Sequence, residues 1–214
     1  MKVLTFLLLM LVPFCFTNAQ RIGKLAPDKP HIEFPDNSWG ADIMFGEGGF
    51  GLGTFYKKSF SLNLSGFVDV SLSEAKDSRE IEYVDYYGNT FVLNKKNRIF
   101  YVPLNFGLQY RLFTNVLTDS FRPYLTAGVG PSFILTNPYE REFFNAIGHT
   151  QVHYAAGGYA GLGADIGTST SSLIGLNVRY YYSHLFTDGV ESLIGNWKKD
   201  FGGLFISLSI GIMY

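Results

Sequence analysis

The sequence predicts an all-β fold, an eight-stranded antiparallel up-and-down transmembrane β-barrel, on three observations. Apolar residues alternate with small or polar ones in repeated stretches, which is the period of a β-strand. Charge is sorted along the chain, because residues 74–98 hold ten charged side chains whereas residues 147–184 hold two, Asp165 and Arg179. Beyond the N-terminus, no stretch approaches the ~18 consecutive apolar residues that a membrane-spanning helix needs. A barrel with a lipid-facing belt and wet loops accounts for all three.

The last fourteen residues, 201–214, show the alternation most clearly and contain no charged residue. One face carries Leu204, Ile206, Leu208, Ile210, Ile212 and Tyr214, and the other carries Gly203, Phe205, Ser207, Ser209, Gly211 and Met213. A water-facing strand would carry Lys, Glu or Thr on its second face, so the larger apolar face is expected to meet lipid. At ~3.3 Å per residue and a tilt of ~40°, the stretch covers the ~25 Å apolar band of a transmembrane barrel.

The same stretch resembles the final strand of bacterial outer-membrane β-barrel proteins, which alternates apolar residues and finishes on an aromatic one. The matching positions are Leu208, Ile210, Ile212 and Tyr214. In that family they form the signal read by the barrel-assembly machinery, so the resemblance implies this machinery as a partner. The chain is similar to the small OmpA/OmpX/OmpW group, which implies a place in outer-membrane lipid and lipopolysaccharide.

Residues 1–19 have the charged start, apolar centre and small-residue exit (Thr17–Ala19) of a cleaved secretory signal peptide. An N-terminal membrane anchor is the alternative, but the apolar run is short of the ~20 residues needed to span. A lipoprotein signal at Cys15 is set aside because Phe14 stands where that signal needs a small residue. Cys15 is the only cysteine, so the mature chain would have no thiol chemistry.

Residues 20–38 carry three prolines and mixed charges, which predicts a periplasmic lead-in ahead of a barrel from 39 to 214. Four strands are expected in the first half: 39–45, 50–57, 60–72 and 104–112, with a short turn at Lys57-Lys58 between the second and third. The first hairpin has the weakest pattern. It rests partly on the even number of strands in bacterial single-chain barrels.

The charged stretch 73–97 contains Tyr86-Tyr-Gly-Asn89 between two strand-like runs, which predicts a hairpin extending beyond the membrane as the longest surface loop. Four further strands are expected at 121–135, 151–166, 174–183 and 201–214. Short turns at 114–120 and 167–172 alternate with longer loops at 137–150 and 185–200. In the resembled family, short turns face the periplasm and long loops face outside.

Five charged residues fall on the inward faces of these strands and form the predicted polar network of the lumen: Asp69, Arg111, Arg122, Asp165 and Arg179. His153 lies near the outer mouth. Unpaired charges in a dry lumen would cost several kcal/mol, so mutual pairing as a polar plug is the first interpretation, and a ligand or ion path is the second. Asp165 is expected to pair with Arg111 or Arg122 at the periplasmic floor.

Catalysis is not predicted, although Ser183 and His184 form an adjacent pair. Neighbouring strand residues point to opposite faces, so these two are not expected to act as nucleophile and base. The four histidines show no metal-ligand spacing, and the glycine-rich stretch 46–53 lacks the helix that a phosphate-binding loop requires. No metal and no cofactor are therefore expected. Removing Lys2 with the signal leaves 16 basic against 18 acidic residues, a net charge of 16 − 18 = −2, which does not suggest nucleic acid.

The sequence thus predicts a small integral outer-membrane barrel with a structural or surface-interaction role and a mostly plugged lumen. The alternatives are a narrow channel or binder of a small hydrophobic ligand, as in OmpW-like proteins, and a lipid A-modifying barrel enzyme. A soluble lipocalin-like barrel would need an apolar interior and a charged exterior, the reverse of the alternation found here.

Overall fold

The predicted eight-stranded antiparallel barrel is confirmed by the computed structural model, which describes residues 32–214 apart from 78, 115, 118 and 142. The eight strands of the wall are β1 (Asn37–Gly46), β2 (Gly49–Ser59), β3 (Leu64–Glu74), β6 (Asn97–Arg111), β7 (Phe121–Pro138), β8 (Gln151–Ile166), β9 (Ser172–Leu185) and β12 (Asp200–Met213). Each pairs with its neighbours in the sequence, and β12 closes on β1. The first hairpin, β1–β2, is a full part of the wall. The signal peptide and most of the lead-in lie outside the described residues and stay predictions.

The barrel closes through a continuous β1–β12 ladder from Ser38↔Met213 to Gly46↔Phe205. The backbones of Asn37 and Tyr214 extend it by one step, with N–H···O distances of 3.2 and 2.9 Å in the two directions. The wall therefore has no free strand edge at which another chain could pair.

The wall strands alternate between an exposed apolar face and a buried inward face, as the sequence predicts. On β12, for example, Ile206 and Ile210 are exposed while Phe205, Ser207 and Ser209 are buried. Inside the barrel, aromatic rings fill space that glycines leave open. A Cβ built on Gly107 would lie 2.4 Å from the ring of Phe67. The lumen is thus packed by side chains, as expected for eight strands.

The turn between the second and third strands was wrongly placed at Lys57-Lys58. Both lysines belong to β2, and the turn is Phe60–Asn63, where the amides of Phe60 and Ser61 both donate to the carbonyl of Leu64. Phe60 and Leu62 are exposed in this turn. Apolar residues exposed at the edge of the wall continue the alternation of a strand, which is why the pattern did not mark the boundary. Lys57 consequently stays on a strand and faces the lumen.

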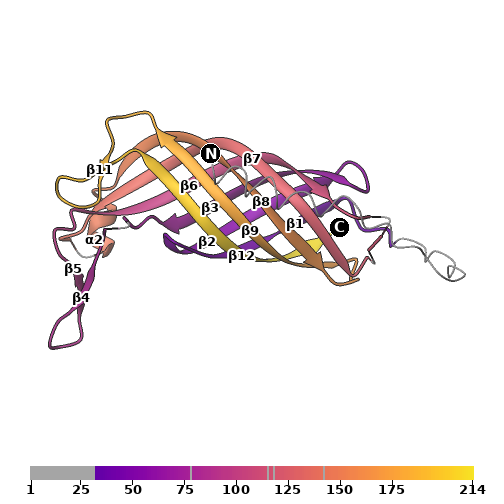
Figure 1. Ribbon diagram of the computed structural model, residues 1–214, viewed down its shortest axis with the longest axis horizontal. Coiled ribbons are helices and arrows are strands. Elements are labelled where there is room, and N and C mark those ends of the chain that lie inside the picture. The colour runs from indigo at the N-terminus through magenta and orange to yellow at the C-terminus, as the bar shows by residue number, and fades with distance from the viewer. Residues whose placement is uncertain (1–31, 78, 115, 118, 142) are drawn as a thin grey trace, which may run out of the picture. The chain divides into compact units, whose positions relative to one another are not determined.

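The connections differ at the two ends of the barrel (Figure 1). The loop end carries the connections 75–96, 139–150 and 186–199, together with the two-residue turn Glu47–Gly48. The turn end carries 60–63, 112–120, 167–171 and the C-terminus. The loop-end connections contain the hairpins β4 (Glu82–Val84)–β5 (Thr90–Val92) and β10 (Val190–Glu191)–β11 (Trp197–Lys198), and helix α2 (Phe143–Ile147). The hairpin predicted around 86–89 is confirmed.

No helix in the described part of the chain has both the length and the apolar character to cross a membrane.

Candidate functional site

The middle of the lumen is occupied by an ion triad centred on Arg179. Its guanidinium lies 3.0 Å from the carboxylate of Asp42 and 3.8 Å from that of Asp69, and all three side chains are at least nine-tenths buried. Asn105 and Tyr159 donate hydrogen bonds to Asp69 at 2.9 and 2.8 Å. Each charge of the triad therefore has an oppositely charged neighbour and Asp69 receives two further donors, which offsets part of the cost of burying these groups.

Aromatic rings surround the triad and complete what we call the central plug. The ring of Tyr181 lies 4.8 Å from that of Tyr159 and 5.6 Å from that of Phe205, and the Arg179 guanidinium lies 5.1 Å from the centre of the Tyr159 ring. Phe67 also stacks on Tyr159, with 5.8 Å between the ring centres. These rings come from β3, β8, β9 and β12, so the plug joins opposite walls of the barrel.

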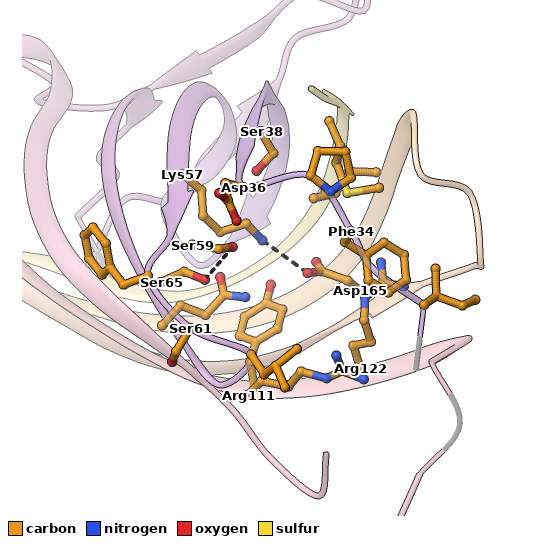
Figure 2. Close-up of a pocket in the computed structure, with 18 residues that line it drawn as sticks. Phe34, Asp36, Ser38, Lys57, Ser59, Ser61, Ser65, Arg111, Arg122 and Asp165 are labelled. Carbon is orange, nitrogen blue, oxygen red and sulfur yellow. Dashed lines mark hydrogen bonds and ion pairs between the residues drawn. The ribbon is translucent and has the colours of Figure 1, made fainter. Parts of the chain in front are cut away.

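Below the plug, a cavity of about 290 Å³ forms a vestibule at the turn end (Figure 2). Lys57 and Asp165 face each other across it, with Nζ 3.1 Å from the carboxylate. Arg111 pairs with Asp119 at 2.7 Å. Arg122 donates instead to the backbone carbonyls of Asp119 and Gly167, at 2.7 and 2.6 Å. A small cavity of about 20 Å³ lies between the vestibule and the plug.

The described end of the lead-in packs against the vestibule. The amide of Ile32 donates to the carboxylate of Asp119 at 2.8 Å, and the ring of Phe34 lies 4.0 Å from the Arg122 guanidinium. Phe34 also packs on a buried apolar cluster that includes Leu173 and Met213. The segment therefore narrows the mouth of the barrel at the turn end.

All five residues of the predicted network face the lumen, but they fall into two groups. Asp69 and Arg179 meet in the central plug, and Arg111, Arg122 and Asp165 lie around the vestibule. The expected partner of Asp165 was wrong: its ion pair is with Lys57. Arg122 is opposite Asp165 in the β7–β8 register, but its guanidinium is held by carbonyl groups.

Two charged residues of the site that lie on wall strands were missed by the sequence reasoning, Asp42 and Lys57. Asp42 lies between the outward residues Ala41 and Ile43 of the expected first strand, so the alternation alone could have assigned it to the lumen. Lys57 was lost because the turn was placed on it. Without these two, the plug lacks one carboxylate and the vestibule lacks one cation.

Ser183 and His184 point to opposite sides of the wall. Ser183 is buried and hydrogen-bonded to Tyr101 at 2.6 Å and to Ser132 at 2.9 Å. His184 is exposed outside the barrel, with Nδ1 2.7 Å from the carboxylate of Asp200. The geometry therefore separates the serine from the histidine. In the described residues there is no cluster of three or more His, Cys, Asp or Glu side chains arranged for a metal ion.

At the loop end, a network that we call the loop cap ties connection 75–96 to connection 186–199. Glu80 pairs with Lys95 at 2.8 Å, both side chains being buried, and accepts a hydrogen bond from Ser192 at 2.6 Å. Lys96 pairs with Glu191. Although burial raises the pKa of the Glu80 carboxyl, the hydrogen bonds from Lys95 and Ser192 outweigh it and hold that pKa below its ordinary value.

The four residues of the predicted assembly signal lie together on the outward face of β12 and just beyond it. Ile210, Ile212 and Tyr214 are exposed, and Leu208 is half-buried. Tyr214 follows the last residue of the strand at the turn end. This placement leaves the aromatic ring accessible from outside the barrel.

No family model matches the sequence, and no curated protein matches it either. Among solved structures, the chain is similar to the N-terminal β-barrel domain of Pseudomonas aeruginosa OprF, at 11% identity over 84% of this chain and 98% of that one, with a TM-score of 0.46. It is also similar to the outer membrane protein OprG of the same organism (14%, 85% and 97%, TM-score 0.45) and to the attachment invasion locus protein Ail of Yersinia pestis (10%, 82% and 95%, TM-score 0.42). Because these identities and TM-scores are low, the assignment of the fold rests on the strand pairing seen in this structure and not on the similarities.

Proposed function

We propose that the chain is a small integral outer-membrane β-barrel with a closed lumen, and that its role is structural or lies in interactions of its surface loops rather than in catalysis. The observation that carries the proposal is the central plug, in which Arg179 sits between Asp42 and Asp69. Solute passing along the lumen would have to separate buried charges, which costs several kcal/mol for each ion.

The outward face of the wall supports the membrane location. Large apolar residues are exposed on every wall strand, for example Trp39, Leu108, Leu162 and Ile206, each at least half exposed. Soluble proteins seldom expose a continuous apolar surface of this kind. Recovery of the protein in carbonate-washed outer membranes is the expected result. Its appearance in the soluble periplasmic fraction would contradict the proposal.

Arginine substitutions at two positions, one on the outward face of a strand and one in a turn at the end of the barrel, test which face of the wall meets lipid. Leu208→Arg, on the outward face of β12, should cost about 2–4 kcal/mol of unfolding free energy in a bilayer, because it places a charge in the apolar band. The same change at Leu62, in the exposed turn Phe60–Asn63, should cost about 0–1 kcal/mol. Urea titrations of both variants in lipid vesicles measure the difference. Equal losses would mean that the wall does not meet lipid as assigned.

Planar-bilayer recordings test the closed lumen. The wild-type protein should give no discrete conductance steps at neutral pH under conditions in which a porin gives them. Regular steps in the wild type would contradict the plug and favour the narrow channel. Lipid A from a strain lacking the gene, analysed by mass spectrometry, should match that of the parent strain. A changed acyl pattern would instead favour the lipid A-modifying enzyme.

A binder of a small hydrophobic compound is the second candidate, favoured by the turn-end vestibule and its apolar residues Phe34, Leu173 and Met213. Saturable binding of indole to protein in lipid nanodiscs would support it. The variant Leu173→Trp, which fills part of the cavity, should abolish such binding. Binding that survives this variant would lie outside the vestibule.

The barrel-assembly machinery is the partner proposed for Leu208, Ile210, Ile212 and Tyr214. Deleting Tyr214 should lower insertion in cells while leaving refolded protein almost as stable as the wild type. If Tyr214 serves only as an interface anchor, insertion should be normal and refolded stability should fall by about 1 kcal/mol through lost aromatic burial. That second outcome would end the signal proposal.

A further inference from the structure

Another cavity, of about 250 Å³, lies at the loop end between the ends of β6, β7 and β8 and the β10–β11 hairpin. We call it the loop-end pocket. Its polar and aromatic lining includes Asn97, Thr136, His149, Gln151, His153 and Trp197. The ends of three wall strands therefore form its floor and one side, and a loop-cap hairpin forms the other. None of these residues takes part in the central plug.

The lining combines one broad apolar surface with several hydrogen-bonding groups. Trp197 is 61% exposed, although tryptophan is normally well buried, and its ring has one charged neighbour, the Lys96 ammonium at 6.0 Å from the ring centre. The side-chain amide of Gln151 has no hydrogen-bond partner among the described residues and offers both donors and an acceptor. His153 is held by Thr136 through Nε2 at 3.3 Å, which leaves Nδ1 for another partner. A ligand here would meet a flat apolar face on one side and polar groups on the other.

The charges at the pocket cancel one another. Lys96 and Glu191 both line it, but they form an ion pair with each other. Glu191 is further engaged by the amide of Gly195. Each of these charges already has a partner, so the pair adds no net charge to the pocket, and we expect neutral ligands to bind in preference to phosphate, sulfate or carboxylate groups.

We propose that the loop-end pocket binds one neutral pyranose unit of a glycan. A pyranose has a face of C–H groups that stacks on an indole and a rim of hydroxyls that exchange hydrogen bonds with amides and imidazoles. The cavity is below the ~300–1,000 Å³ typical of drug-sized ligands, which suits a single ring. The inference gives a ligand class to the surface role proposed above and rests on that proposal for its biological setting.

Trp197 supplies the test, because the chain has only one other tryptophan, Trp39, which lies on the outward face of β1. In a Trp39→Phe background, the fluorescence of Trp197 is titrated with the methyl glycosides of glucose, galactose and N-acetylglucosamine. The protein is held in an amine-oxide detergent, since a maltoside headgroup would itself compete. A saturable change in the millimolar range with at least one glycoside is expected, with little response to glycerol.

Two further variants decide the assignment. Gln151→Ala should weaken binding at least tenfold, whereas Gln109→Ala, a glutamine on β6 that lines the turn-end vestibule instead, should leave it unchanged. The absence of saturable binding for all three glycosides would overturn the proposal, as would equal binding by the two glutamine variants. Tighter binding of glucose 6-phosphate than of the neutral glycosides would overturn its neutral character. These outcomes do not depend on where the protein resides or whether it conducts.

Discussion

The central plug and the loop cap use the same kinds of charged side chains in different surroundings. In the plug, Arg179 lies between two carboxylates from β1 and β3, with every side chain nine-tenths or more buried. In the loop cap, the buried pair Glu80–Lys95 stands next to Lys96, whose side chain is half exposed. Water can therefore replace some partners in the cap, whereas the plug has no such substitute.

The contrast shows that ion pairs serve two purposes in this protein, to stabilise the wall and to order the loops. Buried pairs in the plug hold strands of opposite walls in place, so breaking them should destabilise the whole barrel. Pairs at the water-facing end order the connections above the wall, so breaking them should loosen loops alone. Unfolding free energies should report the effect on the whole barrel, and amide exchange of individual residues should report the effect on the loops.

Arg179→Met should give the largest effect, a loss of about 3–5 kcal/mol of unfolding free energy, because it leaves Asp42 and Asp69 buried without a cation. Urea titration of protein refolded in lipid vesicles measures it. The triple variant Asp42→Asn/Asp69→Asn/Arg179→Met removes the stranded charges and should recover part of the loss. If Arg179→Met were as stable as the wild type, the plug would not differ from the cap.

Asp165→Asn should have an intermediate effect, about 1–3 kcal/mol, because it leaves Lys57 without its charged partner while the vestibule still offers space for water. The same titration measures it. Lys58→Met is the matched control: Lys58 is adjacent on β2 but exposed, and its replacement should change stability little. A loss as large as that of Arg179→Met would show that the vestibule is as dry as the plug.

The loop cap should respond to acid before the barrel does. The pKa of Glu80 is lower in the folded protein than its ordinary value of 4.5, so its stabilisation is present above about pH 4.5 and is lost as the pH falls toward the folded pKa. The protection factors of amides in residues 186–199, which compare the observed exchange with that of an unstructured chain at the same pH, should therefore fall in this range, with wall strands still protected. Glu80→Gln should show fast loop exchange already at neutral pH. If amide protection in residues 186–199 did not change with pH, Glu80 would not have this role in the loop cap.

Much of the wall could be predicted because lipid imposes a simple rule on the outward face. Most outward positions in the middle of the strands are apolar, so the alternation in β12 or β9 marks both the strand and its orientation. The same rule places Asp69 and Arg179 in the lumen. It works across the wall because the side-chain period of two is independent of which strands are neighbours.

The pairing of lumen charges could not be predicted in the same way. Partners inside a barrel depend on the stagger between strands and on how far each side chain reaches, which the alternation does not encode. Asp165 and Arg122 are opposite one another in the register, yet the longer reach of Lys57 from β2 supplies the ion pair. The contacts that join the two connections of the loop cap were beyond prediction because they link residues more than 90 positions apart, such as Lys96 and Glu191.

The pairing of β1 with β12, which closes the barrel, also bears on the rate of folding. Residues 38 and 213, which pair with each other at one end of the ladder and come from the first and last strands of the wall, must meet before the wall is complete. Bringing distant segments together carries a loop-closure cost, and folds dominated by such contacts form slowly. Until the barrel closes, β1 and β12 both present unpaired backbone groups, which lipid cannot satisfy. An open barrel would therefore tend to pair with other chains, and the longer closure takes, the more chain we expect to be lost to aggregation.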